Sequence, residues 1–380
     1  MSFWSLMMAD LKSILTDKAI AVTIFGGVLF YSVLYPLPYL NEVPTKQQIV
    51  VIDGDHSSLS RQVIRHINAS PKLDVVSELA TIEQGQHWIE SGKAHGLMVI
   101  PDGFRRDLIR QKGVTLAYAG DANYFLIYSA VIEGLMSVGI DAGKYVQFNG
   151  LLARGNSAEQ VKHDLEPIKL NSVPAFNPSL GYTPYVVPGV LLLVLHQTML
   201  IGIGILGAGQ WGREGYWNRA SVMQLILARS MVFALLYSLF TCFYVGFCNY
   251  WYGVSVQGDM LQVMLFLIPF ILSTAMSGVA FSCLFVRRDL PTQVLLLISM
   301  PILFLSGFIW PLELIPAPLI GLSQLIPAVP SIQGLLQLNQ MGASWTDIVH
   351  LWWQLWALAL GYLLLAYVGV RYRLNSAVAH

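Results

Sequence analysis

Two aspartates beside a histidine are the first residues in the chain whose types and spacing could support chemistry. Asp53 and Asp55 flank a glycine and are followed by His56, and His87 and His95 lie downstream. Carboxylates and imidazoles serve as metal ligands or as general acids and bases. The Asp-Gly-Asp pattern at the end of an apolar run is, however, also what a tight turn followed by a helix N-cap requires. Because no spacing here matches a known ligand set, we interpret the pattern as a turn.

No other motif predicts catalysis or a bound cofactor. The stretch GIDAGKY (139–145) resembles a phosphate-binding loop, but that loop needs four residues between its glycines and Ser or Thr after the lysine. Here three residues separate the glycines, and Tyr145 follows the lysine. No HExxH zinc motif occurs, and Cys242, Cys248 and Cys283 lie in apolar stretches without paired ligand spacing. We therefore predict no catalytic residue, no metal site and no cofactor bound by this chain.

The composition of the chain indicates a membrane protein. Of its 380 residues, 55% are hydrophobic and 12% are charged, whereas soluble domains carry about 25% charged residues. The 22 basic and 22 acidic residues balance, and we predict no nucleic-acid partner. Charged residues leave seven uncharged windows, each long enough for a helix to cross an apolar bilayer core of about 30 Å. These windows are 19–41, 170–212, 230–258, 260–286, 290–312, 314–346 and 348–370.

Six of the windows are predicted to span the membrane. The window 314–346 contains four prolines, which a continuous helix does not accommodate, and is predicted to be a broken segment. With a cytoplasmic N-terminus, six spans place nine basic residues in segments on the inside and none in the two short outside segments. This arrangement follows the positive-inside rule and places both termini in the cytoplasm. The nine residues are Lys12, Lys18, Arg213, Arg219, Arg229, Arg287, Arg288, Arg371 and Arg373.

These patterns divide the chain into four parts. Residues 1–18 are predicted to form a cytoplasmic interfacial helix, and residues 19–41 an uncleaved first span. Residues 42–178 are predicted to form an extracytoplasmic domain, and residues 179–380 the other five spans. A cleaved signal peptide is the alternative for the N-terminus, but no small-x-small site follows the first window. The apolar face of the first helix carries Trp4, Met7, Met8, Leu11 and Leu15, with Asp10 off that face.

The predicted extracytoplasmic domain alternates strands and helices. Four short apolar runs have the β-branched composition of strands, and segments with helical spacing follow them. This order predicts an α/β domain with a small mixed sheet. The strand segments are QIVVIDGD (48–55), KLDVVSEL (72–79), HGLMVIP (95–101) and VTLAYAGD (114–121).

The predicted spans lack the ionisable residues of an ion-coupled carrier. Such carriers place carboxylates or broken helices near the middle of the membrane. Spans two to six contain no Asp or Glu away from their ends, and His196 and His350 are the candidate ionisable residues inside the windows. If the chain transports a substrate, we therefore expect another chain to supply the energy.

Several stretches resemble the permease subunits of type-2 ABC exporters. The likeness covers nearly the whole chain, from one span through a large exported domain to five more spans. It includes VVIDGDHSSLSRQVIRHI, GLMVIPDGFRRDL and LAYAGDANY in the predicted domain and FNPSLGYTPYVVPGVL (176–191) at the start of the second span. The most specific stretch is LSGFIWPLELIPAPLIGLSQLIPAVPSIQGL (305–335). The resemblance implies a polytopic α-helical membrane protein with six transmembrane helices, a re-entrant hairpin and an inserted α/β extracytoplasmic domain.

The resemblance implies that residues 311–340 form this hairpin, which closes the export path at the outer face. Gly307 would permit close packing, Pro311 and Pro316 would end and restart helices, and Glu313 would lie near the outer rim. Two roles for Glu313 remain open. It caps the N-terminus of the next short helix, favoured by the helix dipole, or it takes part in gating or in substrate contact.

The loop at 207–222 would, by the same resemblance, be the coupling segment that docks into the ATP-binding subunit. Arg213 and Glu214 match the Arg-Glu pair usual there, whereas the following GYWNRA is shorter and more aromatic than the common sequence. Tyr216, Trp217 and Arg219 are residue types enriched at protein interfaces. An aromatic belt at the membrane surface is the alternative interpretation of this loop.

The implied function is that of a transport subunit, not an enzyme. The permease would export an amphiphilic, drug-like or lipid-like substrate across the inner membrane of a bacterial cell. Its implied partners are a separate subunit that binds ATP and Mg, a second permease protomer, the lipid bilayer and, in hosts with an outer membrane, a periplasmic membrane-fusion adaptor. Two alternatives are a membrane receptor or signalling scaffold that uses the extracytoplasmic domain, and a membrane enzyme, for which no catalytic set is found.

Overall fold

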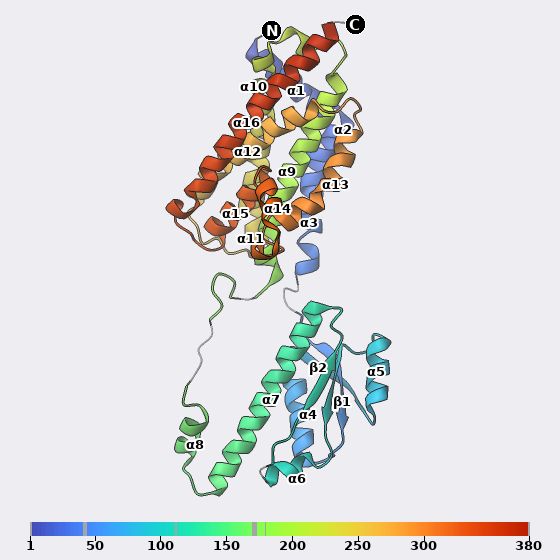
Figure 1. The fold of residues 1–380 in the computed structure, drawn as a ribbon, viewed down its shortest axis with the longest axis vertical. Helices are drawn as coiled ribbons and strands as arrows, with labels where there is room; N and C mark the ends of the chain where they lie inside the picture. The colour runs from blue at the N-terminus through green and yellow to red at the C-terminus, as the bar shows by residue number, and fades with distance from the viewer. Residues whose placement is uncertain (1, 41–43, 111, 169–172, 179, 379–380) are drawn as a thin grey trace. The chain divides into compact units, whose positions relative to one another are not determined.

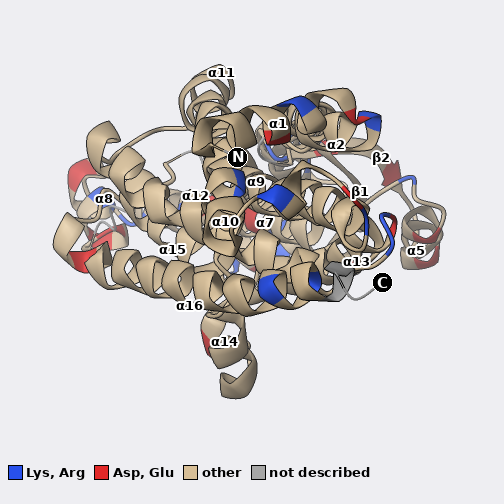
Figure 2. Ribbon diagram, turned by 90° about the horizontal axis from the view of Figure 1, so that it is seen from above, with Lys and Arg blue, Asp and Glu red and all other residues tan. Residues whose placement is uncertain are grey.

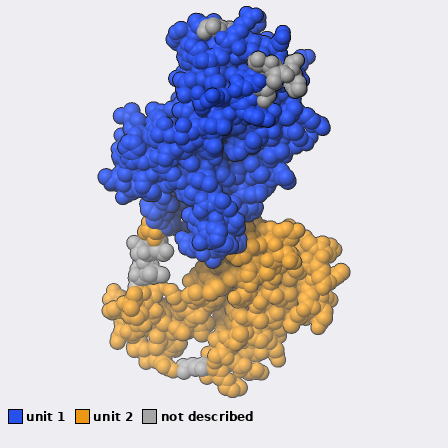
Figure 3. Space-filling view, turned by 45° about the horizontal axis from the view of Figure 1, so that its top comes forward, with its two compact units in different colours: residues 1–42, 174–380 blue, residues 43–173 orange. Residues whose placement is uncertain are grey.

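The computed structural model describes residues 2–40, 44–110, 112–168, 173–178 and 180–378. The chain divides into two compact units, which Figure 1 shows as ribbons and Figure 3 as surfaces. Residues 1–42 and 174–380 form one of them, here called the helical unit, and residues 43–173 form the other, here called the α/β unit. The α/β unit is thus inserted between the first and the later helices of the helical unit.

The helical unit begins with two helical segments. Helix α1 (Phe3–Thr16) is separated by Asp17 from α2 (Lys18–Ala21), and the Asp17 side chain accepts hydrogen bonds from the first backbone N–H groups of α2. A π-helical turn (Val22–Gly26), α3 (Gly27–Leu34) and a 3-10 turn (Leu37–Tyr39) continue α2. The resulting apolar stretch Lys18–Tyr39 is long enough to cross a membrane.

Helix α9 (Tyr182–Gln210) is the core of this unit, because its most apolar window is buried on every side by other helices. The helices around it are α10 (Val222–Cys242) with its continuation through η4 (Phe243–Cys248) and α11 (Asn249–Trp251), α12 (Met260–Ser282), α13 (Leu290–Leu305), η5 (Leu312–Leu314), α14 (Ala317–Ser323), α15 (Ala328–Asn339) and α16 (Trp345–Val378). Glycines allow close approach to α9: a Cβ on Gly204 would lie 2.7 Å from Pro291, and one on Gly278 would lie 2.7 Å from Ile203. Small residues of this kind are typical of helix packing in membranes.

The helical stretches that are long and apolar enough to cross a membrane differ in part from the predicted set. By length and composition, the described residues contain six such stretches. Five of them correspond to predicted spans, and the sixth is α7 (Phe125–Ala153) of the α/β unit. Helix α13, predicted as a span over 290–312, ends at Leu305 and is shorter than the others. The chain is thus mostly helical and has the spans of a polytopic membrane protein.

The α/β unit is built on a four-stranded sheet in the order β2-β1-β3-β4. Strand β1 pairs in parallel with β2 and β3, and β4 pairs antiparallel with β3, so that the predicted mixed sheet is confirmed. The strands are β1 (Gln47–Asp53), β2 (Leu73–Leu79), β3 (Gly96–Ile100) and β4 (Ala117–Gly120), and the helices are α4 (Ser58–Ala69), α5 (Ile82–Glu90), α6 (Phe104–Ile109), α7 and α8 (Ala158–Leu165). That this unit is extracytoplasmic stays a prediction.

Alternating residues of β1 pack on the two faces of this sheet. Ile49 and Val51 join the larger core with α4, α6 and α7, whereas Val50 and Ile52 join a smaller core under α5. Figure 1 shows α7 and α4 on one side of the sheet and α5 on the other. The apolar residues of α7 are therefore explained in part by its packing: Val131, among others, is buried against the sheet.

The Asp-Gly-Asp pattern forms a turn at the end of β1. Asp53 accepts hydrogen bonds from the backbone N–H groups of Asp55 (3.0 Å) and His56 (3.1 Å) and from the Ser60 hydroxyl (2.6 Å). The Asp55 carboxylate accepts from the backbone N–H of Arg105 (3.0 Å). Both carboxylates are thus occupied in shaping the start of a helix, and the turn interpretation is confirmed. Among the described residues, no group of three or more His, Cys, Asp or Glu side chains could hold a metal ion.

Candidate functional site

The loop between α9 and α10 is short and has a defined shape. After α9 ends at Gln210, Gly212 adopts a φ of 73°, which favours glycine. A 3-10 turn, η3 (Tyr216–Arg219), follows. Ser221 then starts α10 through a capping box with Gln224, in which each side chain bonds the backbone N–H of the other residue. Both ends of the loop are therefore fixed by specific backbone geometry.

The five residues predicted to contact an ATP-binding subunit fall into different environments. Arg213, Glu214 and Arg219 are exposed, whereas Trp217 and Tyr216 are partly buried. The Trp217 indole N–H donates to the carbonyl of Arg213 (3.2 Å). The rings of Trp217 and Tyr216 meet edge to face, with their centroids 5.1 Å apart. The loop thus presents three charged side chains to the surface, and its two aromatic rings pack on each other, with Trp217 also bonded to the loop backbone.

Tyr216 is turned into the protein. Its hydroxyl donates to the Asp10 carboxylate (2.5 Å), accepts from the Gln210 side-chain amide (2.9 Å) and lies 3.2 Å from the Ser13 hydroxyl. Burial, with a contribution from the Asp10 carboxylate, raises the pKa of Tyr216 to about 12. The hydroxyl therefore keeps its proton at neutral pH and fastens the loop to α1. Its interior contacts differ from those of a docking residue on the surface.

A buried ion pair lies beneath this loop. Asp10 of α1 and Arg229 of α10 are both fully buried. The Arg229 Nε and Nη2 atoms each lie 3.3 Å from an Asp10 carboxylate oxygen, and Nη2 also donates to the Gln210 side chain. The guanidinium carbon lies 5.9 Å from the ring centroid of Trp211. A charge is tolerated in such an interior only when it is paired and hydrogen-bonded.

We call Asp10, Gln210, Tyr216 and Arg229 the polar cluster. Its members come from α1, from the end of α9, from the loop and from α10, so that the loop is connected to three helices at once. Among the residues that the structure describes, the remaining Nη1 atom of Arg229 has no hydrogen-bond partner. A movement of the loop would therefore be transmitted directly to α1 and α10.

The sequence describes one member of the polar cluster incompletely and another wrongly. Asp10 lies off the apolar face that carries Trp4, Met8 and Leu15, as predicted, but it is buried with Leu6 and Ile14 on the side that packs on the protein. The prediction that the third span starts after Arg229 is wrong, because α10 starts at Val222 and contains this residue. Each buried charge is compensated by the other. The single charge in the apolar sequence of α10 was the available signal.

The outer face of α1 contains most of its predicted apolar residues. Trp4, Met8 and Leu15 are 69%, 59% and 54% exposed, whereas Met7, predicted on the same face, is buried. The helix thus has two apolar faces, of which one packs on the protein and the other remains free for lipid. An interfacial position of this helix stays a prediction.

Further contacts connect the elements at this end of the helical unit. Arg288, between α12 and α13, forms an ion pair with Asp17 at the start of α2. The Arg373 side chain of α16 donates to the carbonyl of Cys283 (2.8 Å). Figure 2 views the molecule from this end, which carries α1 and the last turns of α16, and shows basic segments on α16 and around α2. The predicted inside residues Arg288 and Arg373 thus lie in one region with the loop.

Gly307 lies just beyond the other end of α13 and makes a sharp turn. Its φ is 85°, and a Cβ at this position would lie 2.7 Å from the Leu312 side chain. The next residue, Phe308, packs against Gly189 of α9, where a Cβ would lie 2.9 Å from the Phe308 ring. The Tyr185 hydroxyl also donates to the carbonyl of Phe308. The prediction that Gly307 permits close packing is consistent with this geometry, which glycine alone adopts without strain.

The segment after Gly307 is a series of short helices. Pro311 precedes η5, Pro316 precedes α14, and α14 and α15 form a broken pair bent by 90°. Glu313 is exposed within η5. The N-cap of α14 is Pro316, and no side-chain hydrogen bond caps that helix. Glu313 lies in the first turn of η5, and both roles given to it stay predictions. Its side chain also lines a groove, described below.

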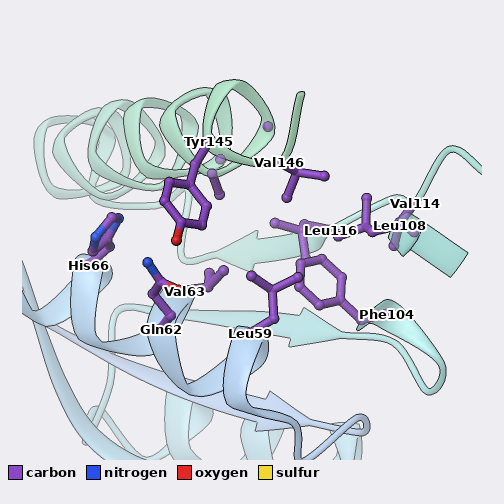
Figure 4. Close-up of a pocket in the computed structure, with 13 residues that line it drawn as sticks. Leu59, Gln62, Val63, His66, Phe104, Leu108, Val114, Leu116, Tyr145 and Val146 are labelled. Carbon is purple, nitrogen blue, oxygen red and sulfur yellow. The ribbon is translucent and has the colours of Figure 1, made fainter. Parts of the chain in front are cut away.

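A small, partly open cavity lies in the α/β unit. Figure 4 shows it between α4, α6 and α7, lined mainly by apolar side chains, with His66, Gln62 and Tyr145 together at one end. Its volume is about 90 Å³, whereas pockets for drug-sized ligands measure about 300–1,000 Å³. The cavity is therefore too small to serve alone as a site for an amphiphilic substrate.

Comparison with known proteins identifies the family of the chain. Residues 18–368 match the family model described as ABC-2 family transporter protein. The chain is 23% identical over 363 residues to the probable multidrug ABC transporter permease YbhR of Escherichia coli O157:H7, with 93% of each chain covered. It is 22% identical over 303 residues to the probable multidrug ABC transporter permease YbhS of Escherichia coli strain K12, with 76% of this chain and 75% of that protein covered. The chain is therefore a multi-pass membrane protein that belongs to the ABC-2 transporter family.

Proposed function

We propose that this chain is the membrane subunit of an ATP-driven exporter that moves an amphiphilic, drug-like or lipid-like substrate outward across a bacterial inner membrane. The observation that carries the proposal is the family match, which extends over residues 18–368 and so includes both units and the connecting loop. The names of two relatives describe multidrug permeases, which supports an amphiphilic substrate. A receptor or scaffold role is not favoured by these similarities.

The proposed contact with the ATP-binding subunit is the loop at 207–222. Arg213, Glu214 and Arg219 are exposed and contact the partner, and Trp217 supports them through its bond to the loop backbone. The polar cluster fixes the loop to α1 and α10, so that a displacement of the loop by the ATP-binding subunit moves these helices. ATP and Mg bind to the partner subunit, and both termini of this chain lie in the cytoplasm, where that subunit acts.

The remaining partners follow from the same proposal. A second permease protomer, identical or closely related, completes the translocation path. The broken pair α14 and α15 closes that path at the outer face, next to Gly307, Pro311, Glu313 and Pro316. The α/β unit is extracytoplasmic and, in hosts with an outer membrane, contacts a periplasmic adaptor.

The test is to purify the tagged full chain from membranes of its own host and to identify the bound proteins by mass spectrometry. We expect an ATPase with Walker motifs to co-purify, and the assembled complex to hydrolyse ATP faster when an amphiphile is added. Deletion of the permease should raise accumulation of at least one amphiphile in whole cells. If no ATPase associates and efflux of all tested amphiphiles is unchanged, the proposed function is wrong.

A further inference from the structure

A groove of about 570 Å³ lies between the start of α9, η5 and α15. Three glutamines line it together: Gln333 and Gln337 of α15, and Gln340, which directly follows this helix. Because Gln340 keeps a helical backbone conformation, the spacing of four and three residues places the three side chains on one face. A row of amides offers a ligand both donors and acceptors of hydrogen bonds.

The groove carries negative charge, which comes from Glu313. Of the described residues that line it, Glu313 is the only one with a charged side chain. Its carboxylate is exposed and has no cationic partner in the lining. Phe176, Phe308 and Met341 provide apolar surface in the same groove. A ligand that complements these walls has an apolar body and a positive charge.

The amide row is incompletely bonded. Gln340 is 8% exposed, and among the described residues its Nε2 has no hydrogen-bond partner. Gln333, by contrast, donates to the carbonyl of Ser306 (3.2 Å) and is thereby held in place. A buried polar atom without a partner points to a missing acceptor. The ligand should therefore carry an acceptor oxygen as well as a cationic group.

We propose that this groove is a binding site for amphiphilic amines: the ammonium group binds Glu313, and an acceptor oxygen on the body binds the Gln340 amide. The inference rests on the proposed function, because it names a chemical class for the exported substrate. The same carboxylate repels anionic amphiphiles and so disfavours their binding. The apolar lining holds the body of the ligand and contributes affinity without selecting for charge.

The experiment measures binding of monodansylcadaverine to the full chain in nanodiscs of phosphatidylcholine, a lipid without a primary amine. This probe has a primary amine, sulfonyl oxygens and an aromatic body. Its N-acetyl derivative keeps the body and loses the charge. We expect the amine to bind about tenfold more tightly than the derivative, because hydrogen bonds to charged groups are strong. Glu313→Gln should remove this preference, and Gln340→Leu should weaken binding of both probes several-fold.

Two controls keep the test specific. Glu90→Gln, which neutralises an exposed carboxylate of α5, should leave both affinities unchanged. Gln337→Leu changes a less buried member of the row and replaces Gln340→Leu if that variant does not fold. Equal binding of the two probes to the wild type, or an unchanged preference in Glu313→Gln, would overturn the proposal. Because no ATPase is present, such a result would leave the co-purification test of the proposed function intact.

Discussion

Asp10 and Arg229 lie 219 residues apart in the sequence and form a fully buried ion pair in the helical unit. The pair joins the first helix to α10 directly beneath the loop that we propose as the contact for an ATP-binding subunit. A movement of the loop would therefore reach α1 and α10 of the helical unit through this pair.

Breaking this pair from one side should destabilise the protein strongly. Asp10→Asn or Arg229→Met leaves a buried charge without its partner, which typically costs about 3–5 kcal/mol. The double variant removes both charges and should recover part of the loss. Thermal unfolding of the detergent-solubilised chain measures the effect. Arg371→Met, at an exposed position of α16, is the control, and single variants as stable as wild type would show that the pair contributes little.

Tyr216→Phe should loosen the loop and leave its ring in place. The variant loses the hydroxyl bonded to Asp10 and Gln210, a change expected to cost about 1–2 kcal/mol, and should lower amphiphile-stimulated ATPase activity of the complex. Activity equal to wild type would indicate that this attachment is not used in coupling.

The same residue predicts a dependence of stability on alkaline pH. Burial raises the pKa of Tyr216 from about 10 to about 12, so that between these values the folded protein retains a proton that the unfolded chain has lost. The stability due to Tyr216 is therefore complete below pH 10 and decreases as the pH rises towards 12. The measurement is the difference between the unfolding midpoints of the wild type and of Tyr216→Phe at each pH. This difference removes the contributions of lysines and of the other tyrosines, which both proteins share. A difference that stays constant between pH 9 and pH 12 would contradict it.

Exposed residues of the loop should affect coupling more than stability. Glu214→Ala and Arg219→Ala remove surface charges and should reduce co-purification of the ATP-binding subunit and stimulated ATPase activity several-fold, with an unchanged melting temperature. Glu90→Ala, in the α/β unit, is the matched control. Normal assembly and activity of both loop variants would place the docking surface elsewhere.

Gly307→Ala should destabilise the turn after α13. Alanine is strained at a φ of 85°, and its Cβ would overlap the Leu312 side chain, for an expected cost of about 1–3 kcal/mol. The control is Gly321→Ala in α14, where a Cβ has open space and the change should stabilise the helix by about 0.5–1 kcal/mol. The two melting temperatures should therefore shift in opposite directions, and a parallel shift would contradict the role assigned to Gly307.

The sequence predicts the helices and strands well, because the spacing of apolar residues along the chain indicates which side chains of an element are buried. The β-branched residues Ile49 to Ile52 predict a strand. In the structure they are buried alternately on the two faces of the sheet. The proline series after Gly307 predicts broken helices, and the structure has them. Hydropathy alone does not separate α7, whose apolar residues partly cover a sheet, from a span.

Pairwise contacts between distant segments could not be predicted in the same way. Charged residues usually mark the ends of membrane spans. Arg229 does not, because its charge is neutralised by Asp10 inside the helical unit. The inward direction of Tyr216 likewise depends on Asp10, which lies on another element. The groove at Glu313 requires η5, α9 and α15 to converge, and no local pattern specifies that convergence.

The ion pair also bears on biogenesis. An arginine costs about 2.5–3.5 kcal/mol to insert at the centre of an apolar helix, and less in the first half of α10, where Arg229 lies. Because a ribosome makes the N-terminus first, Asp10 has emerged well before Arg229 reaches the insertion machinery. The carboxylate on α1 is thus available to neutralise the guanidinium as α10 enters the membrane, and a chain that lacks its first helix should insert α10 poorly.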